Sequence, residues 1–110
     1  MSAKAHITDS HCHLDFPDFE GELDAVIARA TEAGVTRMVT ICTKLHKLPE
    51  VQRIADTYPQ VFYAAGIHPM SVAEHPPVTF DDLMALTKHP KMVGIGETGL
   101  DCYWDDTPIE

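Results

Sequence analysis

The chain of 110 residues is long enough for one small domain, and its 45% hydrophobic and 23% charged residues are close to the globular average. This composition excludes a disordered or fibrous protein. The formal net charge of −9, from 17 acidic and 8 basic residues, argues against a broad basic surface for nucleic acid. A phosphate substrate stays open, because bound divalent metals would supply positive charge at one point.

Short apolar runs alternate with helical periodicity along the chain. The apolar runs predict strands at 5–8, 38–42, 61–65 and 92–95. Between them, three helices are predicted: one with Leu23, Val26, Ile27 and Ala30 on its apolar face, one over 48–58, and one after Thr79. We therefore expect the order β-α-β-α-β-α-β.

The predicted helices are bounded by residues that are typical of helix ends. Gly34 stands where a C-terminal cap of the first helix should be. Pro49 fits the first turn of the second helix, and Pro59 ends it. Thr79 can cap the third helix, with Asp82 three residues later as its partner in a capping box.

Strands that alternate with helices predict a parallel sheet built through right-handed crossovers. Two architectures fit: an open doubly wound sheet, or the first half (about four β/α units) of a (β/α)₈ TIM barrel. A whole barrel needs about 250 residues, so the second architecture requires a truncated chain. Thr107 and Pro108 resemble the start of a fourth helix. We therefore expect residues 1–110 to be the N-terminal part of a single domain, truncated before that helix.

His11 and His13 form a His-x-His pair just past the first predicted strand. In an extended chain, side chains at i and i+2 point to the same side, about 6.6 Å apart, so both imidazoles can reach one metal ion. Cys12 should point away and is not expected to be a ligand. An isolated His-x-His is more often a pair of surface histidines, but active sites of barrels are built at strand ends. The position therefore favours a metal site.

Glu97 and His68 each follow a predicted strand in the same way. A carboxylate at the position of Glu97 can bridge two metal ions, although alone it is more often a surface or capping residue. The glycines around it also match a dinucleotide fingerprint, which we reject because no helix is predicted to follow. His68 precedes Pro69, and alone it is as readily a turn histidine as a functional one.

The joint arrangement favours function. Strands one, three and four each end in a potential ligand or acid–base group, and in a parallel sheet these ends share one edge. Cys42 and Thr43 end strand two and are expected to pack around the site. Tyr103 and Trp104, after Glu97, are more often a cover for the core than a platform that stacks a base.

Three segments carry a resemblance to a known family: Asp9-Ser10-His11-Cys12-His13-Leu14-Asp15, Gly66-Ile67-His68-Pro69 and Val93-Gly94-Ile95-Gly96-Glu97-Thr98-Gly99-Leu100-Asp101. In order and spacing they resemble the TatD family of metal-dependent deoxyribonucleases. The His-x-His pair alone is shared with many amidohydrolase-like enzymes, many of which use a modified lysine where this chain has Glu97. The resemblance spans the whole chain and implies a TIM barrel.

The resemblance also implies a site with two divalent metal ions, namely Mg, Mn or Zn. It assigns His11 and His13 to one ion, Glu97 to a bridge between both, and His68 to the mouth of the active site, so that Glu97 and His68 are the expected catalytic residues. The family's other two histidines and its late aspartate come from later strands, and no residue here takes their roles. The expected activity is hydrolysis of DNA or another phosphodiester, often exonucleolytic, by activated water.

The alternative is a catalytically incomplete half-barrel that acts only as a structural or oligomerising fragment. Four strands would leave two unpaired edges and one bare apolar face, so such a chain should aggregate or form a homo-oligomer through those edges. Bound metal and native mass distinguish the two hypotheses.

The three cysteines, Cys12, Cys42 and Cys102, are an odd number without the spacing of a disulfide framework, which favours a reducing compartment. Residues 1–5 include no apolar segment of a signal peptide. No apolar run approaches the roughly 20 residues that cross a membrane. We expect a soluble, cytoplasmic protein.

Overall fold

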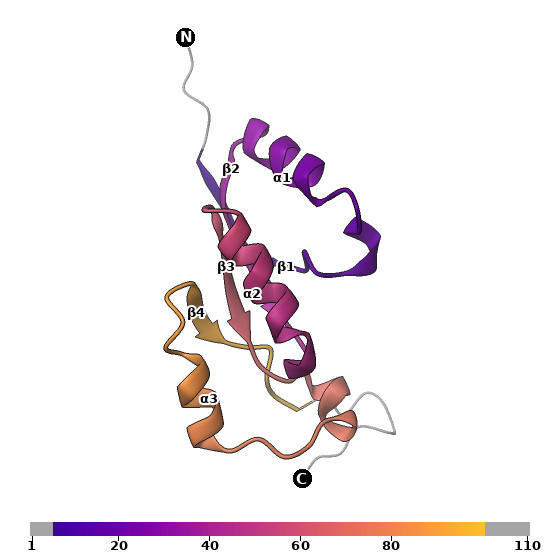
Figure 1. Cartoon of the computed structure of the whole chain (residues 1–110), viewed down its shortest axis with the longest axis vertical. Coiled ribbons are helices and arrows are strands. Elements are labelled where there is room, and N and C mark those ends of the chain that lie inside the picture. The colour runs from indigo at the N-terminus through magenta and orange to yellow at the C-terminus, as the bar shows by residue number, and fades with distance from the viewer. Residues whose placement is uncertain (1–5, 101–110) are drawn as a thin grey trace.

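The computed structural model describes residues 6–100, in which strands and helices alternate (Figure 1). The elements are β1 (Ile7–Cys12), α1 (Leu23–Glu32), β2 (Val35–Cys42), α2 (Leu48–Thr57), β3 (Val61–Ala65), α3 (Phe80–Leu86) and β4 (Met92–Ile95), with short 3₁₀ helices η1 (Pro17–Phe19), η2 (Leu45–Lys47) and η3 (Pro69–Glu74). This is the predicted order. The fourth helix expected at Thr107 and Pro108 lies outside the described residues.

The four described strands form one parallel sheet in the order β1-β2-β3-β4. A doubly wound sheet reverses its strand order at a switch point. A barrel instead adds each new strand beside the last one. Because the described sheet has no reversal, the fold is a partial α/β barrel, and the doubly wound alternative is excluded.

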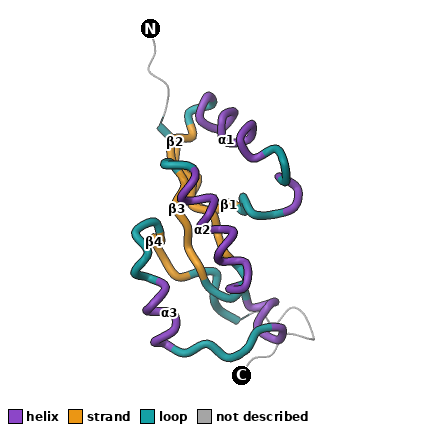
Figure 2. The backbone as a smooth tube through the Cα atoms, viewed as in Figure 1, coloured by secondary structure: helices purple, strands orange, loops and turns teal. Residues whose placement is uncertain are grey.

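The core lies between the sheet and its helices. Figures 1 and 2 show α2 running along the strands and α1 near the end of the sheet where β2 begins, and both helices contact β2. The buried cluster consists of Leu14, Ile27, Met38, Cys42, Leu48, Val51, Ile54, Ala55, Val61, Tyr63 and Ala65. Full burial of one such aliphatic side chain stabilises a fold by about 1.5–3 kcal/mol. The cluster therefore holds the sheet against its helices.

The helix ends follow the chemistry of their residues. Gly34, directly after the cap of α1, has a φ of +103°, which glycine adopts without strain. Pro49 lies in the first turn of α2. The Asp82 N–H donates to Thr79 Oγ1 at 3.1 Å, and the Thr79 N–H donates to Asp82 Oδ2 at 3.0 Å, which completes the predicted capping box. Among the described helices, none has the length and apolar character to span a membrane.

Strand boundaries were predicted well at β3 and β4 but not at β1 and β2. The strand predicted at 38–42 begins earlier, at Val35. The predicted strands at 61–65 and 92–95 match β3 and β4. The strand predicted at 5–8 is instead Ile7–Cys12, so it includes the polar residues that were expected to follow it. The reason is pairing with β2, since Cys12 lies opposite Thr40 in the parallel register.

Candidate metal centre

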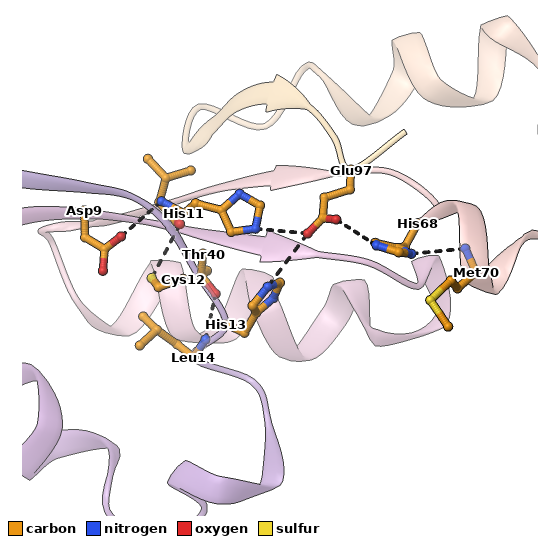
Figure 3. Close-up of polar contacts among 10 residues, drawn as sticks. Asp9, His11, Cys12, His13, Leu14, Thr40, His68, Met70 and Glu97 are labelled. Carbon is orange, nitrogen blue, oxygen red and sulfur yellow. Dashed lines mark hydrogen bonds and ion pairs between the residues drawn. The ribbon is translucent and has the colours of Figure 1, made fainter. Parts of the chain in front are cut away.

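The end of β1 presents two histidines on the side of the strand that faces away from the core (Figure 3). His11 lies inside β1 and His13 directly after it, which corrects the expectation that both follow the strand. Their neighbours alternate with them as strand geometry requires. Cys12 packs against the core with its Sγ 3.5 Å from the Val39 carbonyl oxygen, and Leu14 is buried. As predicted, Cys12 points away from the histidines.

Glu97 reaches the histidines because the ends of β3 and β4 approach closely. The Gly96 N–H donates to the Ala65 carbonyl at 3.1 Å, which extends the pairing beyond β4. A Cβ atom on Gly66 would lie only 2.6 Å from the Glu97 carbonyl oxygen, a distance that side chains do not tolerate. Glycine at position 66 is therefore a requirement of the site.

One carboxylate oxygen of Glu97 faces both histidines of the pair. Glu97 Oε1 lies 3.0 Å from His11 Nε2 and 3.8 Å from His13 Nε2. In the part of the chain that the structure describes, these three residues form a group whose possible ligand atoms all lie within 4.8 Å of one another. Two imidazoles and a carboxylate are a donor set that suits zinc, manganese and other divalent ions. The residues present therefore fit the implied metal.

His68 holds the second carboxylate oxygen. Its Nε2 lies 3.0 Å from Glu97 Oε2, while its Nδ1 accepts the Met70 N–H at 3.1 Å (Figure 3). A neutral imidazole carries one proton, so a ring that accepts at Nδ1 donates from Nε2. His68 is thus a hydrogen-bond donor to Glu97 and is not a member of the three-residue group.

Phe16 packs against the ring of His13, a contact that sequence reasoning missed. The two rings stack with centroids 4.5 Å apart and an interplanar angle of 17°. The Phe16 N–H donates to the His13 carbonyl at 3.3 Å, which closes a tight turn. On its other side His13 meets the His11 ring edge-on, with centroids 5.2 Å apart. The spacing of three residues was the available signal, because it is the spacing of a turn.

The thiols nearest the site are held in the protonated form. Burial raises the pKa of Cys12 to about 12 and that of Cys42 to about 11. Neither thiol belongs to the group around Glu97, because Cys12 packs against the core and Cys42 is buried within it. Cys42 is fully buried at the end of β2. The expected roles of Tyr103 and Trp104 lie outside the described residues.

Comparisons with known proteins agree with this geometry. The sequence profile of the TatD-related DNases matches residues 8–110. The chain is 38% identical over 104 residues to the uncharacterized metal-dependent hydrolase YjjV of Escherichia coli K12, covering 93% of this chain and 40% of YjjV. It is 36% identical over 93 residues to the 3'-5' ssDNA/RNA exonuclease TatD of Salmonella typhimurium, covering 84% of this chain and 36% of that protein.

The structural comparison gives the same relationship. The crystal structure of the E. coli YjjV protein, a TatD homologue, matches with a TM-score of 0.80 at 36% sequence identity. The match covers 91% of this chain and 39% of that structure. The chain therefore spans about 40% of the length of these relatives.

Proposed function

Since the chain belongs to the family of TatD-related DNases, we propose that it contributes to a metal-dependent phosphodiesterase that acts on DNA or RNA strands. His11, His13 and Glu97 would hold divalent metal, with Glu97 shared between two ions. The observation that carries this proposal is that Glu97 meets His11, His13 and His68 although the three regions lie far apart in sequence. A structural surface would not require such convergence.

The chain's own residues would prepare the site before the substrate arrives. Bound divalent ions would supply an activated water and neutralise charge on the phosphate. His68 donates to Glu97 Oε2 and so fixes the direction in which Oε1 faces the histidine pair. Positioning of this kind is the protein's main contribution in a metal-assisted hydrolase.

The proposal of a phosphodiester substrate is supported by the charge of the chain as well as by the relatives. A chain with a net charge of −9 would repel a polyanion over most of its surface. Metal ions at the edge of the sheet would provide the positive charge that a phosphodiester needs. Binding should therefore depend on the metal and not on a basic groove.

The second candidate is an oligomerising half-barrel without catalysis. Apolar side chains are exposed on both edge strands, namely Ile7 (51%) on β1 and Val93 (57%) and Ile95 (45%) on β4. Exposed apolar residues on unpaired edges favour association with a second copy. This candidate predicts a native mass above that of the monomer and no bound metal.

One experiment separates the candidates: elemental analysis of the purified chain with native mass measured on the same sample. We expect stoichiometric zinc, manganese or magnesium that is lost in a His11→Ala/His13→Ala variant. The matched control is His6→Ala/His46→Ala, which removes two exposed histidines outside the group. Metal retained in the first variant would overturn the site, and an oligomer without metal would favour the second candidate.

A further inference from the structure

The imidazole of His13 carries an unsatisfied atom. Its Nε2 faces Glu97, but its Nδ1 is buried and, among the described residues, has no hydrogen-bond partner. An imidazole that binds a metal through one nitrogen carries its proton on the other, and that N–H is almost always donated to an acceptor. The proposed site therefore leaves a buried donor to be satisfied.

Asp15, two residues after His13, has a buried acceptor atom that also lacks a partner among the described residues. This atom is the carboxylate oxygen Oδ1. Only Leu14 separates the two residues in the chain, so both unsatisfied atoms lie at the start of the same turn.

The turn between the two residues is fixed. The N–H of Leu14 donates to Thr40 Oγ1 at 3.0 Å, and the Leu14 side chain is only 5% exposed (Figure 3). The turn is closed by the Phe16 N–H on the His13 carbonyl, and Phe16 covers the imidazole. The backbone therefore holds Asp15 and His13 near each other and leaves adjustment to their side chains.

Resting on the proposed function, we propose that Asp15 is the positioning residue of the metal ligand His13. Its Oδ1 accepts the His13 Nδ1–H, directly or through one water molecule, when Nε2 binds the ion. A carboxylate behind a histidine ligand fixes the tautomer and makes the ligand more basic. Two otherwise unexplained buried atoms, a donor and an acceptor, thereby satisfy each other.

The test measures metal affinity and the state of one nitrogen. Zinc affinity of the whole chain is determined by competition with a chromophoric chelator for the unmodified chain, Asp15→Asn and Asp15→Ala. Loss of an outer partner weakens metal binding by about 10–100-fold, and we expect Asp15→Ala to lie near the upper end. Asp15→Asn should lose less, because its amide oxygen still accepts a hydrogen bond. The matched control is Asp18→Ala on η1, an exposed carboxylate that should bind zinc as the unmodified chain does.

A second readout reports on His13 itself. In the zinc-loaded, ¹⁵N-histidine-labelled chain, the Nδ1 resonance of His13 should shift in Asp15→Ala and stay in place in Asp18→Ala. Unchanged affinity and an unchanged resonance in folded Asp15→Ala would overturn the proposal. If both Asp15 variants fail to fold, the unmodified chain decides, since a rapidly exchanging Nδ1 proton on zinc-loaded His13 would also overturn it. An unmodified chain that binds no zinc would overturn the proposed function too, whereas failure of the variants alone leaves that function standing.

Discussion

At each end of the sheet, a histidine accepts a backbone N–H at Nδ1 and faces a carboxylate with Nε2, but the surroundings of the two pairs differ. At the carboxyl end, His68 accepts the Met70 N–H at Nδ1 and faces Glu97 with Nε2 at 3.0 Å. At the opposite end, His89 accepts the Lys91 N–H at Nδ1 and faces Asp56 with Nε2 at 3.5 Å. In both pairs, the backbone N–H two residues after the histidine donates to Nδ1. The proton of the neutral ring is therefore on Nε2, which donates to the carboxylate.

The difference lies in what surrounds the carboxylate. The Glu97 side chain is 26% exposed and its other oxygen meets two further histidines, whereas the Asp56 side chain is 62% exposed. Solvent screens an exposed pair, and a partly enclosed group with several donors keeps its direction. A histidine–carboxylate pair therefore forms part of a candidate metal site only where the strand ends bring further ligands beside it.

The largest effect should come from removing the charge at the centre of the site. Glu97→Gln keeps the shape of the side chain but replaces an anionic ligand with a neutral amide. Since loss of an outer partner already weakens metal binding by about 10–100-fold, we expect this change to exceed about 100-fold. The measurement is zinc affinity by chelator competition, and binding within tenfold of the unmodified chain would contradict the role of Glu97.

The second largest effect should come from a substitution at Gly66, where the backbone closely approaches the Glu97 carbonyl oxygen. Gly66→Ala would put a Cβ atom 2.6 Å from the Glu97 carbonyl oxygen, so the backbone must move. We expect zinc affinity to fall by at least about 10-fold, as for loss of an outer partner, and the free energy of unfolding to fall by about 1–3 kcal/mol.

Gly94→Ala is the matched control for this change, because its Cβ would meet only the Ala64 Cβ at 4.0 Å, an ordinary contact. Zinc affinity and the free energy of unfolding should both stay close to those of the unmodified chain. Equal losses in the two variants would show that glycine content, and not the approach at position 66, matters.

The comparison of the two histidines can be tested directly with His68→Phe and His89→Phe. Each variant removes the acceptor of a backbone N–H, and such a hydrogen bond contributes about 0.5–1.5 kcal/mol of stability. Only His68→Phe should also weaken zinc binding, by about 10-fold, because it frees Glu97 Oε2. Chemical denaturation and chelator competition on both variants give the two quantities. A similar loss of zinc affinity in His89→Phe would remove the distinction between the two ends.

Sequence reasoning recovered what depends on local pattern. The bounds of β3 and β4, the capping box of Thr79 and the direction of Cys12 toward the core all follow from periodicity and turn chemistry within a few residues. The pattern failed at β1, where polar residues are held in the strand by pairing with β2. Local preference does not contain that contact.

The site was predicted as residues that share one edge of the sheet, without the contacts between them. His11, His13, His68 and Glu97 were each selected because they follow a strand, and the structure brings the three histidines around the Glu97 carboxylate. The tautomer of His68, the stacking of Phe16 and the buried oxygen of Asp15 depend on the geometry of the turns in which these residues lie. Such details arise only once the fold sets the distances.

The smallest effect should come from Asp56→Asn, the counterpart of Glu97→Gln at the other end of the sheet. The carboxylate lies 3.5 Å from His89 Nε2 and is mostly exposed, and exposed pairs contribute about 0.2–1 kcal/mol. Asparagine still accepts the His89 N–H, so we expect the free energy of unfolding to change by less than about 0.5 kcal/mol. Zinc affinity should not change. A larger loss of stability would mean that the pair at this end is as constrained as the one at Glu97, and the contrast between the two ends would then rest on the additional histidines alone.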